Sequence, residues 1–129
     1  MRRRMLAMVP VLVLALVTST LAAQLEPLVR GWEQFFEIDW AGGQRGTEPV
    51  VYGHVHNTWG VPARSVRLLV DALDPAGNVV GQKVTWVPGT ITPGMRAYFE
   101  APVPAPAASY RVSVFAFDWD QAGGDVDHR

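Results

Sequence analysis

Residues 51–57 of the chain read VYGHVHN, with valine or glycine at three alternate positions and tyrosine or histidine between them. Successive side chains of a β-strand point to opposite faces, so this alternation predicts a strand with one apolar and one polar face. Turn-forming residues follow at 57–60, which read NTWG. A strand with one apolar face needs a second layer to cover it, and the first expectation is therefore a layered β fold.

The same two-residue period recurs downstream. Further strands are predicted at residues 66–71, 79–87, 95–101 and 109–119, with turns at 74–78 and 91–94. Residues 102–106, which read PVPAP, predict an extended loop because proline cannot donate to a strand ladder. About six short strands at turn spacings of about 10 residues, without a long helical stretch between them, predict an all-β antiparallel sandwich of six to seven strands.

The region from residue 25 to residue 40 supports two interpretations. Its first half has apolar residues at helical spacing, whereas its second half alternates aromatic or aliphatic residues with acidic ones at strand spacing. We expect a short helical or irregular lead-in to about Gly31 and then a strand from about Gln34 to Trp40. Gly42-Gly43 and the flexible residues 44–47 are expected to end that strand.

The first 23 residues have the order of a secretory signal peptide. Three arginines at positions 2–4 precede an apolar run over residues 5–17, and small or polar residues follow at 18–23. Cleavage is expected after Ala22 or Ala23, which places the mature chain outside the cytoplasm, either periplasmic or secreted. The alternative is an uncleaved anchor, because residues 5–23 approach the roughly 17 residues that span a bilayer; membrane contact would then come only from this segment.

The mature chain of about 106 residues is long enough for one domain that is stable on its own core. We expect an N-terminal segment with the first strand over 24–48, the sandwich core over 49–119 and a polar acidic tail over 120–129. Cleavage would lower the eleven Lys and Arg to eight, against twelve Asp and Glu, a net charge of −4 that argues against nucleic acid as a partner. The chain has no cysteine, and therefore no disulfide, thiolate ligand or cysteine nucleophile.

Residues 50–117 resemble the FxLYD-type family of small bacterial extracytoplasmic domains. The residues that carry the resemblance are VYGHVHN at 51–57, residues 66–81 through the turn DPAGN at 74–78, ITPG at 91–94 with Phe99, and YRVSV at 110–114. Residues 70–74 keep the aspartate and the aliphatic pattern of the family's motif, without its aromatic start or its tyrosine. The resemblance implies an immunoglobulin-like fold and export, and it brings no established enzymatic activity or catalytic residues.

His54 and His56 are the candidate metal ligands. On a strand, residues two apart project from the same face with Cβ atoms about 7 Å apart, close enough for two imidazoles to reach one ion. A zinc site needs roughly three or four ligands, and the remaining histidine is His128 in the tail. We expect no metal and no other cofactor, and periplasmic metal handling through His54 and His56 stays as the alternative function.

Catalytic residues are not expected. Two carboxylate pairs, Glu37 with Asp39 and Asp118 with Asp120, have a spacing near that of inverting glycosidases, but both pairs alternate with apolar residues as a solvent-facing side would. The acidic tail does not have the glycine and acidic spacing of a calcium loop. We therefore expect a non-enzymatic protein.

The last predicted strand carries an aromatic cluster of Phe115, Phe117 and Trp119 on one face, while Tyr110, Val112, Val114 and Ala116 are assigned to the face packed into the sandwich. Monomers seldom leave such an aromatic area in water, so cover by Trp32, Phe36 or Trp40 is the favoured interpretation. The other possibility is a face that interacts with a partner and includes Tyr52, Phe115, Phe117 and Trp119. These observations predict an exported β-sandwich module that binds or positions another protein or an envelope component.

Overall fold

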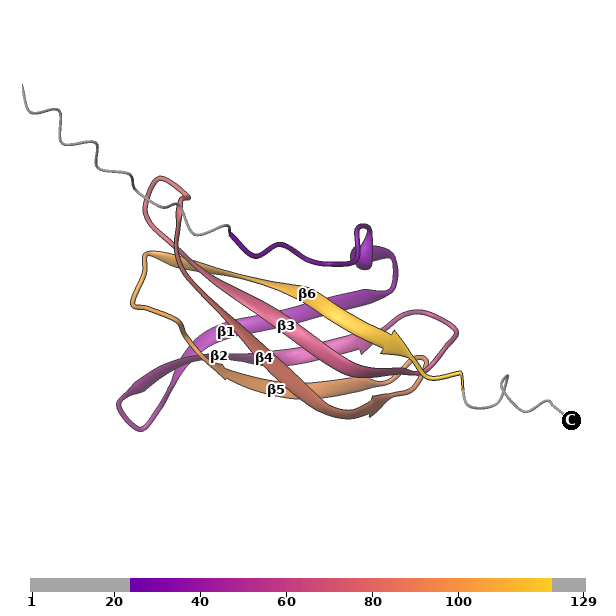
Figure 1. The fold of residues 1–129 in the computed structure, drawn as a ribbon. Helices are drawn as coiled ribbons and strands as arrows, with labels where there is room; N and C mark the ends of the chain where they lie inside the picture. Colours follow the sequence, from indigo (N-terminus) through magenta and orange to yellow (C-terminus); the bar gives the residue numbers. More distant parts are fainter. Residues whose placement is uncertain (1–23, 122–129) are drawn as a thin grey trace, which may run out of the picture.

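The computed structural model describes residues 24–121 of the chain. Within them, six strands form two three-stranded antiparallel sheets that pack face to face, in the orders β1-β2-β5 and β4-β3-β6 (Figure 1). The antiparallel sandwich predicted from the sequence is confirmed. In chain order, the elements are the 3-10 helix η1 (Trp32–Gln34), β1 (Phe36–Arg45), β2 (Glu48–Asn57), β3 (Ala63–Leu73), β4 (Val79–Ile91), β5 (Arg96–Pro102) and β6 (Ser109–Trp119).

The connectivity is that of an immunoglobulin-like sandwich. Hairpins join β1 to β2 and β3 to β4, and the chain changes sheets between β2 and β3, between β4 and β5, and between β5 and β6. Strands β1, β2 and β5 take the places of A, B and E, and β4, β3 and β6 take those of C′, C and F. The predicted signal peptide over 1–23 and residues 122–129 of the predicted tail lie outside the described residues.

The core consists of inward-facing side chains from both sheets. Val51 and Val55 in β2 are fully buried, as are Leu68 and Val70 in β3, and this is the alternation that the sequence predicted. Phe36 in β1 is 1% exposed and joins them. The other buried members of this cluster are Ala63, Val66, Val87, Ile91, Phe99, Ala101, Val112 and Val114.

The first strand differs from its prediction at both ends. It begins at Phe36, after η1, and it runs on through Gly42 and Gly43 to Arg45. The two glycines continue the pairing with β2, and the Tyr52 ring lies over Gly43, where a methyl group would be 2.8 Å from Tyr52 Cε1. The turn comes at residues 46 and 47, where Gly46 has a positive φ of 63°, a value that glycine adopts without steric cost.

Three smaller differences concern the middle of the chain. Strand β3 begins three residues before its predicted start, and β4 continues past Val87 to Ile91, which lies opposite Ala63. Met95, the first residue of the strand predicted over 95–101, lies just before β5 and is 59% exposed. The prediction for this residue was wrong because its carbonyl and amide belong to the turn, where they bond to Asn57 and Thr92.

A β-bulge in β6 changes which side chains face the core. Leu68 lies opposite Val114, but the preceding residue of β3, Arg67, lies opposite Ala116, so Phe115 is an extra residue. Val112 and Val114 therefore point inward before the bulge. After the bulge, the residues that point inward are Phe117 and Trp119. The predicted inward face, which continued to Ala116, is right only as far as the bulge.

Candidate functional site

The outer side of the β1-β2-β5 sheet is lined by polar and aromatic side chains and by Ala41, in three rows that the strand register defines. No Val, Leu or Ile occurs among these nine residues, although the opposite side of the same sheet is the core. We call this surface the polar face. Its rows, each running from β1 through β2 to β5, are Glu37–His56–Arg96, Asp39–His54–Tyr98 and Ala41–Tyr52–Glu100.

Asp39 connects the two histidines of the polar face. Its Oδ2 lies 2.7 Å from His56 Nε2, and its Oδ1 lies 3.4 Å from His54 Nδ1. The backbone amide of His54 also donates to Asp39 Oδ1 at 3.2 Å. The hydrogen bond with His56 is the main cause that lowers the pKa of Asp39 below its ordinary value of 3.8, and His54 adds to it.

The histidine pair thus lies on one face, as the sequence predicted, and each ring has a partner in Asp39. The two ring centroids are 6.3 Å apart. Among residues 24–121, no group of three or more histidine, cysteine or acidic side chains has the arrangement of a metal site. His128, considered as a further ligand, lies outside the described residues.

The aromatic part of the polar face is Tyr52 and Tyr98. These side chains are 40% and 54% exposed, and the Tyr98 ring meets the His54 ring edge-on at 5.6 Å between centroids. Tyr98 Oη donates to Glu100 Oε2 at 3.0 Å, and Glu100 also pairs with Arg45. The hydrogen bond to the Glu100 carboxylate raises the pKa of Tyr98. The surface is therefore rich in tyrosine and in groups that donate or accept hydrogen bonds.

Gly53 allows β1 and β2 to approach closely under the polar face. A Cβ atom at this position would lie 1.9 Å from the Asp39 carbonyl oxygen and 2.7 Å from Trp40 Cα. Both are backbone atoms, which cannot move aside as a flexible side chain does. This approach sets the β1 backbone so that the Asp39 carboxylate reaches both the His54 amide and the two imidazoles.

The other expected interaction residues do not share a surface with Tyr52. Phe117 lies 4.8 Å from the Phe36 ring, and Trp119 stacks on Phe36 at 6.0 Å. Both are half-buried and pack against the core, so the favoured interpretation of a covered aromatic cluster is confirmed for them. Phe35 adds to the cover, at 6.1 Å from Phe117 and 5.4 Å from Trp119.

Two parts of that interpretation need correction. Trp40 does not cover the cluster: it is 37% exposed and lies toward the β1–β2 turn. Phe115 does not belong with Phe117 and Trp119, because the bulge separates their faces; it is half-buried on the outer side of β6. The proposed face of Tyr52, Phe115, Phe117 and Trp119 is therefore wrong as a single surface.

The two predicted acidic pairs lie in different sheets, one in β1 and one at the end of β6. Glu37 and Asp39 lie on the polar face, where the Asp39 side chain is 59% exposed. Asp118 is exposed in β6, and the Asp120 amide donates to the Pro62 carbonyl.

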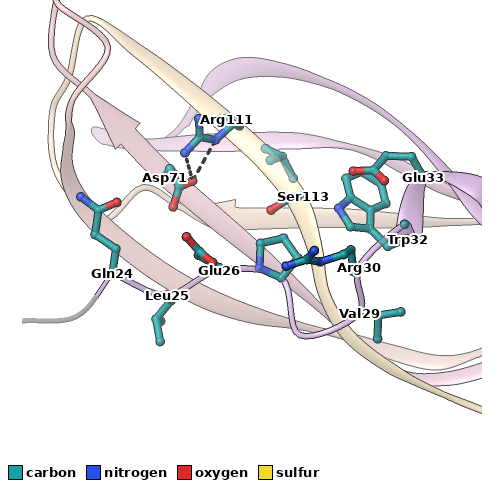
Figure 2. A pocket seen from close by; sticks show the side chains of 13 residues that line it. Gln24, Leu25, Glu26, Val29, Arg30, Trp32, Glu33, Asp71, Arg111 and Ser113 are labelled. Carbon is teal, nitrogen blue, oxygen red and sulfur yellow. Dashed lines mark hydrogen bonds and ion pairs between the residues drawn. The ribbon is translucent and has the colours of Figure 1, made fainter.

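A cleft of about 490 Å³ lies on the other side of the sandwich, where residues 24–33 pass the β4-β3-β6 sheet (Figure 2). The Gln82 side-chain amide in β4 accepts from the Leu25 amide and donates to the Leu25 carbonyl, both at 2.9 Å. At the other end of the segment, the Leu28 amide donates to the Phe115 carbonyl at 2.8 Å. The residues that line the cleft are Gln24, Leu25, Glu26, Pro27, Val29, Arg30, Gly31, Trp32, Glu33, Asp71, Arg111, Val112 and Ser113.

An ion pair forms part of the cleft wall. Asp71 is 2% exposed, and its Oδ2 accepts from Arg111 Nε at 3.0 Å and Nη2 at 2.8 Å. Its Oδ1 accepts from Gln82 Nε2 at 2.9 Å. Leu69, which also lies on the outer side of β3, is 1% exposed. This outer side is therefore not open to water in the way that the polar face is.

Sequence reasoning found the two histidines but missed what surrounds them. Asp39 and Tyr98 fall in two separate predicted strands, and nothing in a single sequence says that these strands flank β2. The cleft was missed altogether, although the run VRLLV at 66–70 is the kind of nearly continuous apolar stretch that a strand buried on both faces has.

Comparisons with family models, with curated proteins and with solved structures give no match to this chain. Over residues 24–121, no helix is both long enough and apolar enough to span a bilayer.

Proposed function

We propose that the chain is an exported, non-enzymatic β-sandwich module that binds or positions another protein or an envelope component through its polar face. The observation that supports this proposal is the exposure of Tyr52 and Tyr98 among charged side chains on one three-stranded surface. Tyrosine, tryptophan and arginine are the residue types that most often contribute binding energy at protein interfaces. The resemblance to FxLYD-type extracytoplasmic domains fits this proposal.

The polar face suits a protein surface better than a small molecule. Its rows are set by regular strand pairing, so the side chains stand on a rigid support and lose little freedom on binding. Asp39, His54 and His56 already hold one another in place. Such a surface offers carboxylate, imidazole and phenol groups for hydrogen bonds with a partner, with tyrosine rings to exclude water from them.

Affinity capture from the envelope fraction of the exporting cells tests this proposal. A double variant Tyr52→Ala/Tyr98→Ala should weaken capture of the bound species by about 100-fold, as the loss of two interface anchors does. The matched control is Trp86→Ala, which removes a 61% exposed aromatic side chain from β4 in the other sheet. Equal capture by the wild type and both variants would refute a role for the polar face.

Export is part of the proposal and has its own test. Intact mass of the chain recovered outside the cytoplasm should correspond to a start at about Gln24. A chain that retains residues 1–23 in a membrane fraction would contradict cleavage and leave export standing. Recovery of the full chain from the cytoplasm alone would contradict both.

Periplasmic metal handling through His54 and His56 is the alternative function, and thermal melting separates it from the first. With the Asp39 carboxylate already between the two imidazoles, near-stoichiometric zinc or copper should leave the melting temperature unchanged. A metal-dependent rise that disappears in His54→Ala/His56→Ala would put the alternative first, because a ligand that binds only the folded state raises its stability.

A further inference from the structure

We propose that the cleft beside β6 is a second binding site, which takes an extended peptide segment of a partner protein as an added strand on the free edge of β6. The polar face and this cleft lie on different sheets, so the proposal is independent of the function proposed above. It follows from the backbone groups at this edge, from the size and charge of the cleft, and from one unpartnered hydroxyl inside it.

The backbone of β6 has free hydrogen-bonding groups along the cleft. The Asp74 amide bonds to Asn78 on the β4 side of β3, and the Leu73 carbonyl accepts from Ala108 on the β6 side. The amide and carbonyl of successive strand residues point to alternate sides, so the amide and carbonyl of Val70 point to β4. Val112 lies opposite Val70 in β6. Its own amide and carbonyl therefore point away from β3, toward the free edge. Val112 lines the cleft although its side chain is in the core, so its backbone faces the cleft.

The same alternation turns the backbone of Tyr110 and Val114 to this edge. In immunoglobulin-like sandwiches, strand G lies next to strand F, and β6 takes the place of F. Within residues 24–121, no strand pairs with that edge. The N-terminal segment passes beside β6 (Figure 1). It makes a single backbone hydrogen bond to this strand, from the Leu28 amide to the Phe115 carbonyl. An edge of this kind is a ready template for another strand.

The cleft has the size and charge for a short length of peptide. Its volume of about 490 Å³ falls within the range of ligand sites. Its charged lining consists of Glu26, Glu33 and Asp71 against Arg30 and Arg111, and Asp71 and Arg111 neutralise each other. With that pair set aside, Glu26 and Glu33 remain against Arg30, and this slightly acidic lining favours an uncharged peptide backbone over an anionic ligand such as a phosphate.

Ser113 is a polar group inside the cleft that lacks a partner. The residue is 8% exposed, and none of the described residues forms a hydrogen bond with its hydroxyl. Figure 2 shows this oxygen pointing into the space that Asp71, Glu26 and Arg30 surround. Among the described residues, the buried side-chain atom without a partner is Thr85 Oγ1, so the Ser113 hydroxyl keeps contact with solvent, and a bound peptide group would replace water as its partner.

Residues 24–31 form the outer wall of the cleft, and few contacts attach them to the sheet, so this segment can move to admit a peptide. Residues 24–31 are attached by the pair of hydrogen bonds between Leu25 and Gln82 and by the bond from Leu28 to Phe115. Leu25 and Leu28 are 44% and 68% exposed, so little apolar area ties the segment down. Gly31, with a positive φ of 82°, joins this segment to η1.

The test uses dodecapeptides selected from a random library against the mature chain. Binding should slow amide hydrogen exchange at Tyr110, Val112 and Val114 by at least tenfold, because these amides would gain partners. Ser113→Gln, which fills the cleft, should weaken binding at least tenfold, whereas Thr90→Gln on exposed β4 should change it less than twofold.

Three results would overturn the proposal: no peptide is selected, protection appears at other amides, or Ser113→Gln binds as the wild type does. The exchange measurement is made on the unmutated chain, so it holds even if Ser113→Gln fails to fold. The variant Tyr52→Ala/Tyr98→Ala should bind the selected peptides normally. Loss of peptide binding in that variant would assign the peptides to the polar face instead.

Discussion

Replacing Phe117 with alanine tests the arrangement that the bulge in β6 produces. The Phe117 ring has centroid distances of 4.8 Å to both Phe36 and Trp119, and 6.1 Å to Phe35. Truncating a buried phenylalanine costs about 3–5 kcal/mol, and half-burial places Phe117 near the lower end, at about 3 kcal/mol. That is a large part of the roughly 5–15 kcal/mol by which a domain is stable.

Urea unfolding of the mature chain measures this loss. With a denaturant slope of roughly 1–3 kcal/mol per M, the midpoint of Phe117→Ala should fall by about 1–3 M. Trp119→Ala should behave similarly. The matched control Trp86→Ala removes a ring that is 61% exposed and contacts Arg67 at 4.9 Å, and should cost about 1 kcal/mol or less. Midpoints near the wild type for both Phe117→Ala and Trp119→Ala would refute the inward orientation of these rings.

Three further changes have distinct expected outcomes. Gly53→Ala should destabilise the chain by about 3 kcal/mol, measured by urea unfolding, because the added Cβ would meet the Asp39 carbonyl. The control Gly42→Ala, whose Cβ would have no atom within 4 Å, should cost less than about 1 kcal/mol. Equal losses would contradict the close approach of β1 and β2 at Gly53. The pKa of Asp39, followed by NMR, should lie below 3.8 in the wild type and rise toward that value in His56→Ala. The stability that this lowered pKa contributes is present above the unfolded pKa and is lost as pH falls through the folded pKa. An unchanged Asp39 pKa in the variant would rule out His56 as the cause. Thr85→Val should raise stability by about 1 kcal/mol, since Thr85 Oγ1 is buried without a hydrogen-bond partner, and a loss measured by urea unfolding would show that this hydroxyl is satisfied.

The sequence predicted the strands of the sandwich because their signal is local. The alternation around Val51 and Val55 and the turn at 74–78 depend on neighbouring residues, and both appear in the structure at the predicted places. The last strand, predicted over 109–119, has these bounds in the structure.

The features that escaped prediction depend on contacts between distant segments. The bulge at Phe115 arises from pairing with β3, and a single extra residue there reverses the face of every side chain that follows. Gly42 and Gly43 have poor strand propensity, yet β2 pairs with them and the Tyr52 ring covers Gly43.

In the candidate site, too, the features that depend on local spacing were predictable, and those that depend on contacts between distant strands were not. That Tyr52, His54 and His56 share a polar side follows from their spacing. The strand order β1-β2-β5 places Asp39 beside both histidines and Tyr98 beside His54, and a single sequence does not reveal this order. The covering of Asp71 by residues 24–33 depends on a segment about 40 residues away in the chain.

Site-specific photo-crosslinking tests most directly whether the polar face binds a partner. A photoreactive phenylalanine analogue is placed at Tyr98 and, in a separate variant, at Trp86, which is similarly exposed on the other sheet. Irradiation of the exporting cells should give a discrete crosslinked species from position 98 and none from position 86. Absence of any species at position 98, or the same species at both positions, would contradict binding through the polar face.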